Sequence, residues 1–193
     1  GSAFSRGRTV QVLQDINVTI GRGEVLGLVG ESGSGKSTLA KSILGMTEYQ
    51  GEIVHHSRRP QMVFQDPYSS LNPSFTIYQS LADPLRHFGV VNKTNQRALI
   101  ADILEAVNMR PEYMDRYPHE FSGGQRQRIG IARALLVHPE MVICDEAVSA
   151  LDVSIQAQVI NLLKSLQEKF DLTLIFISHN LSLVKYISDR VGV

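Results

Sequence analysis

The chain contains the stretch Gly30-Glu31-Ser32-Gly33-Ser34-Gly35-Lys36-Ser37-Thr38, which fits the pattern G-x-x-x-x-G-K-[ST]. An apolar run, residues 25–29, precedes it, and a helix-forming run, residues 39–44, follows it. A strand, a glycine-rich turn and a helix in this order direct several backbone N–H groups into one concavity that accepts phosphate oxygens. Lys36 adds a positive charge for the β- and γ-phosphates, and the Ser37 hydroxyl can bind Mg²⁺. An ordinary Gly/Ser surface loop is the alternative, but the flanking strand and helix favour a phosphate-binding loop for a nucleotide.

Length and composition limit the classes of protein to which the chain can belong. At 193 residues it is large enough for one domain, or for one core with an inserted lobe. Its 19 Lys and Arg residues balance 19 Asp and Glu residues, so we expect no nucleic acid as an obligate partner. The single cysteine, Cys144, excludes an intrachain disulfide framework and suits a reducing compartment. We find neither a stretch apolar enough to span a bilayer nor a signal peptide, and we expect any membrane connection to run through another protein.

Strand and helix patterns alternate, which predicts an α/β fold with a mostly parallel sheet. Strands are expected at residues 24–29, 52–54, 61–64, 141–144, 172–177 and 191–193. Two short alternating segments between residues 10 and 20 are expected to be antiparallel edge strands. Helices are expected at residues 36–44, 77–88, 97–107, 125–137, 153–169 and 181–188.

The strand signals fade between residues 73 and 120, where helical patterns dominate. We therefore expect a helical subdomain, residues 73–120, inserted into a nucleotide-binding core of residues 1–72 and 121–193. The chain stops inside a predicted strand, so we expect this core to be truncated at its C-terminus.

Two carboxylates follow the apolar run at residues 141–144. A buried strand beside the phosphate loop would bring Asp145 to the shell of a magnesium ion. Glu146 would then be placed to polarise a water for attack on the γ-phosphorus. A strand that simply ends in an acidic turn would look the same, but its pairing with the phosphate loop favours hydrolysis.

A second anion-binding motif precedes the basic helix at residues 126–133. It comprises Ser122, Gly123, Gly124 and Gln125, which combine a hydroxyl, bare glycine N–H groups and a helix N-terminus. A plain helix cap with a flexible approach is the alternative reading. Two phosphate-binding motifs on one small domain indicate a dimer in which the motif of each subunit completes the nucleotide pocket of the other subunit.

In their order along the chain, these motifs resemble the nucleotide-binding subunit of an ATP-binding cassette (ABC) transporter. Residues 121–125 resemble the family signature, with Phe121 where Leu is common. Gln65 is similar to the glutamine of the glutamine loop, Asp152 to the end of the loop that contacts the opposite subunit, and His179 to the switch histidine. The resemblance implies a P-loop NTPase (RecA-like) core with an antiparallel edge subdomain.

The resemblance also implies roles for individual residues. The catalytic set would be Lys36, Gln65, Glu146 and His179, and the magnesium ligands would be Ser37, Gln65 and Asp145. ATP would contact residues 30–38, Gln65 and His179 of one subunit, and Ser122, Gly123, Gly124, Gln125 and Asp152 of the other. The adenine would stack on Phe4 and pack against Val12.

Three longer stretches, residues 61–73, 147–158 and 187–191, are similar to the oligopeptide/dipeptide/nickel importer branch. This implies an ATPase with ATP and Mg²⁺ as cofactors, which powers uptake of peptides or similar small solutes. Its partners would be transmembrane permease subunits, a second ABC ATPase subunit and, indirectly, a solute-binding protein, at the cytoplasmic face of the membrane. A soluble ABC ATPase acting on DNA or ribosomes, an exporter subunit and a non-hydrolysing module remain alternatives.

The chain departs from the family pattern at three places. Ala147 stands where proline is common, and Asn180 stands where Asp is usual and is expected to change only a helix cap. The stretch at residues 51–61 is shorter than the pattern leads us to expect, which predicts a missing loop.

Overall fold

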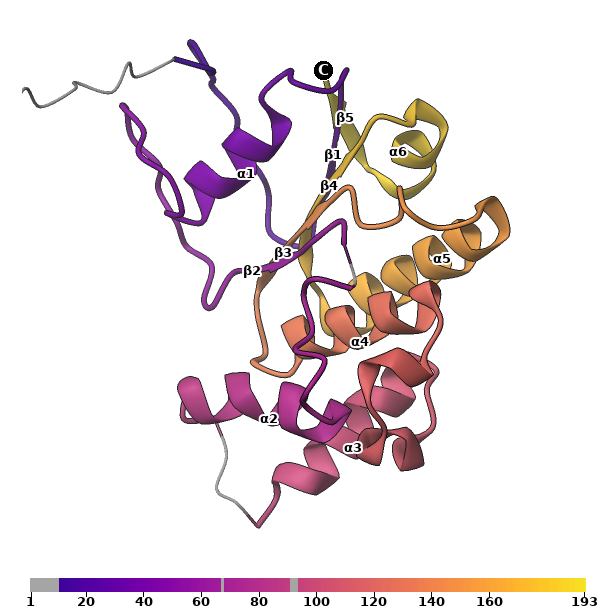
Figure 1. Cartoon of the computed structure of the whole chain (residues 1–193). Coiled ribbons are helices and arrows are strands. Elements are labelled where there is room, and N and C mark those ends of the chain that lie inside the picture. Colours follow the sequence, from indigo (N-terminus) through magenta and orange to yellow (C-terminus); the bar gives the residue numbers. More distant parts are fainter. Residues whose placement is uncertain (1–10, 67, 91–93) are drawn as a thin grey trace, which may run out of the picture.

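The computed structural model describes residues 11–66, 68–90 and 94–193 (Figure 1). Within these residues, five parallel strands form one sheet in the order β2-β3-β4-β1-β5. The strands are β1 (Val25–Val29), β2 (Gln61–Val63), β3 (Met141–Asp145), β4 (Thr173–Ser178) and β5 (Arg190–Gly192). The parallel sheet predicted from the alternating pattern is therefore confirmed.

The predicted helices are also present, with ends that differ by one or two residues. They are α1 (Lys36–Ile43), α2 (Ile77–His87), α3 (Gln96–Ala106), α4 (Gly123–Leu135), α5 (Val153–Phe170) and α6 (Leu181–Ile187). Two short 3-10 helices, η1 (Pro111–Asp115) and η2 (Pro118–Glu120), lead into α4.

The sheet separates two apolar cores because side chains alternate between its faces. Along β3, Met141 and Ile143 pack with Ala40 of α1, whereas Val142 and Cys144 pack on the face covered by α4 and α5. The strand β4 alternates in the same way, with Ile175 and Ile177 in the core beside Ala40 and Leu174 and Phe176 in the core beside α4 and α5. Figure 1 shows α1 on one side of the sheet and α4 and α5 on the other. The layer order is therefore helix, sheet, helix.

Residues 73–90 and 94–120 contain helices and no strand, as the sequence predicts. Leu81 and Leu85 of α2 and Ile100 and Leu104 of α3 are fully buried. They share one apolar cluster with Ile129 of α4 and with that face of the sheet. The helical part of the chain therefore rests on α4.

The predicted antiparallel edge strands are wrong for the described residues 11–20, which contain no strand, and the strand predicted at residues 52–54 is also absent. A strand needs a neighbouring strand with which it can form hydrogen bonds. Each of these two segments could have been that neighbour for the other, but both are irregular. Val12, Ile16 and Val18 are consequently about half exposed, and Val54 more so. The alternating apolar pattern therefore predicted strands that do not form, because no partner strand is available to them among the described residues.

Candidate nucleotide-binding site

The candidate site is built at the carboxyl ends of four neighbouring strands. Because β2, β3, β4 and β1 are parallel and adjacent, the segments that follow them start at the same edge of the sheet. The phosphate loop follows β1, Asp145 ends β3, His179 follows β4, and Gln65 lies two residues after β2. The topology therefore gathers residues that lie more than 100 positions apart in the chain.

The phosphate loop turns from β1 into α1, and residues 31–34 are exposed. Gly35 has a left-handed backbone with φ of 94°. A Cβ at Gly35 would lie 2.6 Å from the tip of the Leu13 side chain, which could shift, so it is the backbone conformation that calls for glycine there. The Lys36 ammonium lies on the loop and donates to Gly30 O and Glu31 O at 2.7 Å and to Ser34 Oγ at 3.1 Å. These contacts hold the positive charge at the loop that would receive the phosphates.

The loop is joined to β3 by one hydrogen bond between side chains. Ser37 Oγ, in the first turn of α1, lies 3.1 Å from Asp145 Oδ1. A hydroxyl and a carboxylate are hard oxygen ligands of the kind that Mg²⁺ prefers, and Mg²⁺ usually takes few protein ligands beside phosphates and waters. Across the described ranges, no cluster of three or more His, Cys, Asp or Glu side chains could hold a metal. The pair therefore fits Mg²⁺ bound together with a phosphate.

Glu146 follows β3 with an unusual backbone, since its φ is 53°. Its N–H donates to Ile177 O at 3.0 Å, and its carbonyl accepts from Ser149 N and Ser149 Oγ at 3.2 and 2.9 Å. Such a left-handed conformation costs free energy for a residue with a side chain, and these bonds hold it in place. The chain is thereby bent so that the carboxylate lies at the sheet edge.

The Glu146 carboxylate contacts the predicted switch histidine. Its Oε2 lies 3.2 Å from His179 Nδ1, and the side chain of Glu146 is 18% exposed whereas that of His179 is 64% exposed. Asn180 next to it caps α6, since its Oδ1 accepts from Ser182 N and Leu183 N. The cap expected from Asn180 is therefore formed, and His179 projects from the site toward solvent.

Gln65 is exposed and makes no side-chain hydrogen bond with another described residue. Its neighbours, in contrast, are fixed: Gln127 Nε2 of α4 donates to Phe64 O at 3.1 Å. Asp66 accepts from Tyr68 N at 2.8 Å, and this hydrogen bond lowers the pKa of the Asp66 carboxyl. The structure thus places Gln65 at the sheet edge without joining it to Ser37 or Asp145.

The second anion motif lies at the start of α4, on the other face of the sheet from α1 (Figure 1). Ser122 Oγ accepts from Gln125 N, and Gln125 Oε1 accepts from Ser122 N, so the two residues form a capping box. Asp152 is exposed at the start of α5 and its side chain caps nothing. No hydrogen bond among the residues described here joins residues 122–125 or Asp152 to the phosphate loop. Within the described chain, the motif is therefore not linked by hydrogen bonds to the phosphate loop.

Of the two residues predicted to contact adenine, the structure describes one. Val12 is 51% exposed, and its Cγ1 lies 3.4 Å from the position that a Cβ on Gly35 would take, so Val12 flanks the phosphate loop. Phe4 lies outside the described residues.

A surface cleft that sequence patterns did not reveal lies beside Gln65. It has a volume of about 440 Å³ and is lined by residues that follow α1 and by parts of β2, α2 and α4, with Met46, Phe64, Ser80, Asp83 and Arg133 among its walls. Ser80 Oγ is buried and has no hydrogen-bond partner among the described residues. Burial lowers the pKa of Arg133, and the nearby Asp83 charge opposes that shift. Because four distant segments form the cleft, no local motif could have indicated it.

Three comparisons relate this site to known proteins. Residues 13–149 match the family model described as ABC transporter. The oligopeptide transport ATP-binding protein OppF of Bacillus subtilis is 51% identical over 203 positions, which cover 96% of this chain and 67% of that protein. OppF of Haemophilus influenzae is 49% identical, with coverage of 97% and 62%. A bacterial ABC transporter cassette solved as a dimer is 25% identical with a TM-score of 0.81, covering 97% of this chain and 88% of that one.

These alignments also show that the matched part is shorter than the full length of each relative. It spans 62% to 67% of the two OppF proteins, so part of each lies outside the match. An alignment of 203 positions is longer than the 193-residue chain. The alignment with the Bacillus protein therefore contains positions at which this chain has no residue.

Proposed function

The chain belongs to the ABC transporter family, and from this premise we propose that it binds and hydrolyses ATP to power the import of peptides through a partner permease. One observation carries the proposal of hydrolysis. The Ser37–Asp145 pair and the Glu146–His179 pair lie at the same sheet edge as the phosphate loop. A site that only bound a nucleotide would not need a carboxylate and an imidazole held beside the phosphate position.

We assign the steps as follows. The loop N–H groups and Lys36 bind the triphosphate, and Ser37, Asp145 and Gln65 would hold Mg²⁺. When bound, Mg²⁺ neutralises charge on the phosphoryl oxygens. Glu146 orients the attacking water and accepts its proton, and His179 contacts the γ-phosphate.

We propose that a second ABC subunit completes each site. Residues 122–125 present the N–H groups of a 13-residue helix, which is suited to phosphate, yet they are not joined to the phosphate loop of their own chain. In a head-to-tail pair, these residues and Asp152 would contact the ATP held by the other subunit. The family relative solved as a dimer supports the pairing of two subunits.

The proposal of peptide import rests on the relatives named for oligopeptide transport. None of the helices in the described ranges is long and apolar enough to cross a membrane. We propose that the chain acts at the cytoplasmic face, where a permease segment docks in the cleft beside Gln65 and a solute-binding protein delivers the peptide. No observation favours the alternatives of a soluble ATPase acting on DNA or ribosomes, or of an exporter subunit.

Lys36→Ala tests nucleotide binding, because it removes the ammonium that lies on the phosphate loop. We expect its affinity for MgATP to fall about 100-fold or more, since charge-assisted bonds to the phosphates are lost. Lys41→Ala is the matched control, an exposed lysine in the last turn of the same helix, and it should bind as the wild type does. Isothermal titration measures both, and equal affinities for the two variants would refute the assignment.

Transport is tested separately by detergent pull-down of the full-length protein from its native cells. Recovery of membrane-spanning permease subunits with a solute-binding protein supports peptide import. Recovery of ribosomal or DNA-associated chains alone would leave ATP hydrolysis standing and overturn the transport proposal.

A further inference from the structure

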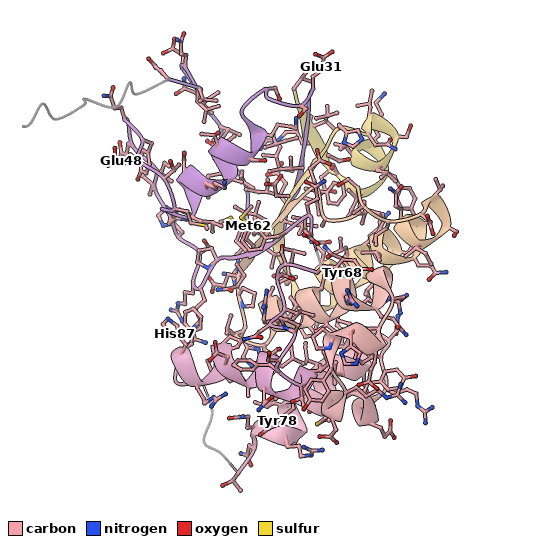
Figure 2. All side chains as sticks on the ribbon, in the orientation of Figure 1. Glu31, Glu48, Met62, Tyr68, Tyr78 and His87 are labelled. Atoms are coloured by element: carbon pink, nitrogen blue, oxygen red, sulfur yellow. The ribbon has the colours of Figure 1, made fainter. Side chains whose placement is uncertain are left out.

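The cleft beside Gln65 contains an unpaired strand edge. Among the described residues, β2 pairs only with β3, and no backbone hydrogen bond outside that pair reaches its three residues. Gln61 and Met62 of this strand line the cleft. In Figure 2, Met62 lies between Glu48, in the segment after α1, and His87 at the end of α2. An edge of this kind offers N–H and C=O groups to the backbone of an extended chain.

The α2 wall of the cleft carries polar groups that lack partners. Ser80 is 6% exposed, and its Oγ has no hydrogen-bond partner among the described residues. Pro84, one turn later in the same helix, has no N–H, so the helix bond that would end at Ser80 O is missing. Both residues line the cleft. Buried polar groups without partners are costly, so this wall favours an occupant that donates hydrogen bonds.

Charges of opposite sign lie on two walls of the cleft. Asp83 is exposed on α2, whereas Arg133 of α4 is half-buried and donates to Ser70 O. Across the described ranges, no salt bridge joins the two side chains. Burial lowers the pKa of Arg133, which is the effect of desolvation on a cation. An occupant with a carboxylate for Arg133 and an ammonium for Asp83 would satisfy both charges.

Between the charged groups, the walls are apolar and leave room. Met46, Met62 and Phe64 lie there, and methionine adapts its shape to what it contacts. A Cβ on Gly130 of α4 would meet nothing within 4 Å, so the helix leaves open space on its side of the cleft. The volume of about 440 Å³ falls within the range of about 300–1,000 Å³ that is typical of small-molecule sites. Three residues of strand span roughly 10 Å, which is the length of an extended tripeptide.

We propose that this cleft binds a short peptide with free ends, extended along the edge of β2. The ammonium of the peptide lies at Ser80 and Asp83, and its carboxylate lies at Arg133. An apolar side chain packs on Met46 and Phe64. A helical segment could not use the strand edge in this way, because its own N–H and C=O groups are bonded within the helix.

The consequence for regulation rests on the proposed function. If the chain powers peptide import, its cleft recognises the class of solute that import delivers. A peptide bound there would exclude the permease segment that we place in the same cleft. Accumulated peptide would therefore slow further import.

The test titrates the whole chain with the tripeptide Ala-Leu-Ala, first with free ends and then with acetyl and amide caps. We expect a Kd of about 1 mM or lower for the free peptide. The capped peptide should bind at least about 10-fold more weakly, because it lacks both charged ends. Two-dimensional NMR should place the changes caused by the free peptide at residues 61–64 and 80–84.

Four variants locate the contacts. Asp83→Asn and Arg133→Lys should each weaken binding of the free peptide about 10-fold, the second because an ammonium cannot hold a carboxylate with two parallel bonds. Gly130→Leu fills the open space and should abolish binding, while its hydrolysis of MgATP shows that it folds. Asp102→Asn, at an exposed carboxylate of α3, is the matched control for Asp83→Asn and should bind as the wild type does.

Regulation is tested with the full-length protein and its permease in lipid vesicles. Free Ala-Leu-Ala on the side of the ATPase should slow import of a labelled peptide, and Asp83→Asn should need about 10-fold more of it for the same effect. Import that continues at the same rate, despite binding measured by titration, would overturn the regulatory role.

The peptide site itself would be overturned by equal affinity for the free and capped peptides, by wild-type binding in Gly130→Leu, or by no binding at 10-fold above the expected Kd. The proposed function fails separately. A chain that binds Ala-Leu-Ala in the cleft but neither binds nor hydrolyses MgATP would support the site and refute the ATPase.

Discussion

At the scale of single residues, Glu146 shows how backbone geometry prepares chemistry. Its left-handed conformation and the hydrogen bonds to Ile177 and Ser149 turn the carboxylate toward His179. The side chain is mostly buried, so its rotamer is restrained before any ligand arrives. A carboxylate restrained in this way can orient a water at little further entropic cost.

Glu146→Gln should slow ATP hydrolysis about 10²- to 10⁴-fold while leaving affinity for MgATP unchanged. The amide keeps the size of the side chain and can still accept from His179, but it cannot take a proton. Phosphate release and titration measure the two quantities. Glu168→Gln, on an exposed position of α5, is the control and should hydrolyse normally. Wild-type turnover by Glu146→Gln would remove Glu146 from its assigned role.

Cys144 provides a prediction about pH. Burial in β3 raises the pKa of its thiol from 9.0 to about 12, with a further contribution from the Asp145 charge. The folded state therefore keeps the proton longer than the unfolded state does, so the contribution of Cys144 to stability is full below about pH 9 and declines as pH rises toward about 12.

We expect the native thiol to resist an aromatic disulfide reagent at pH 8 and to react at once in denaturant. The free energy of unfolding, followed by urea titration between pH 8 and pH 10.5, should fall less steeply in Cys144→Ala than in the wild type. Parallel slopes for the two proteins, or rapid labelling of the folded chain, would show that the thiol is not held protonated by burial.

At the scale of elements, the helix α4 depends on its cap. Ser122→Ala removes the hydroxyl that accepts from Gln125 N, and we expect the free energy of unfolding to fall by about 1 kcal/mol. Ser122→Asp keeps an acceptor beside the positive end of the helix dipole and should remain close to the wild type. Urea unfolding measures the difference, and an unchanged midpoint for Ser122→Ala would mean that the capping box contributes nothing.

Elements also show which parts of the fold local sequence can predict. The apolar runs of β3 and β4 are long enough to need both faces buried, and the helical patterns of α2 and α4 are clear, so these elements were predicted within two residues. Residues 11–20 were mispredicted because pairing depends on a partner elsewhere in the chain. The contact of Glu146 with His179 and the contacts of Gln127 and Arg133 were not predicted, since they join segments brought together only by the sheet and by α4.

At the scale of the whole molecule, the site is divided between two faces. One face of the sheet carries α1 and the phosphate loop, and the other carries α4 with residues 122–125 at its start. We therefore expect the two anion-binding motifs of one chain to contact different phosphates. Two copies, or this chain and a related cassette, placed head to tail would bring each phosphate loop to the other chain's motif.

The central claim is that ATP joins two such subunits, and the mass of Glu146→Gln in solution tests it most directly. Light scattering should give the 21.4 kDa of one chain without nucleotide and twice that mass with MgATP, because hydrolysis no longer reopens the pair. Adding Ser122→Arg, which places a bulky side chain at the shared site, should return the mass to that of one chain. A mass of 21.4 kDa in the presence of MgATP, with binding of ATP shown by titration in the same sample, would contradict the account for a homodimer of this chain.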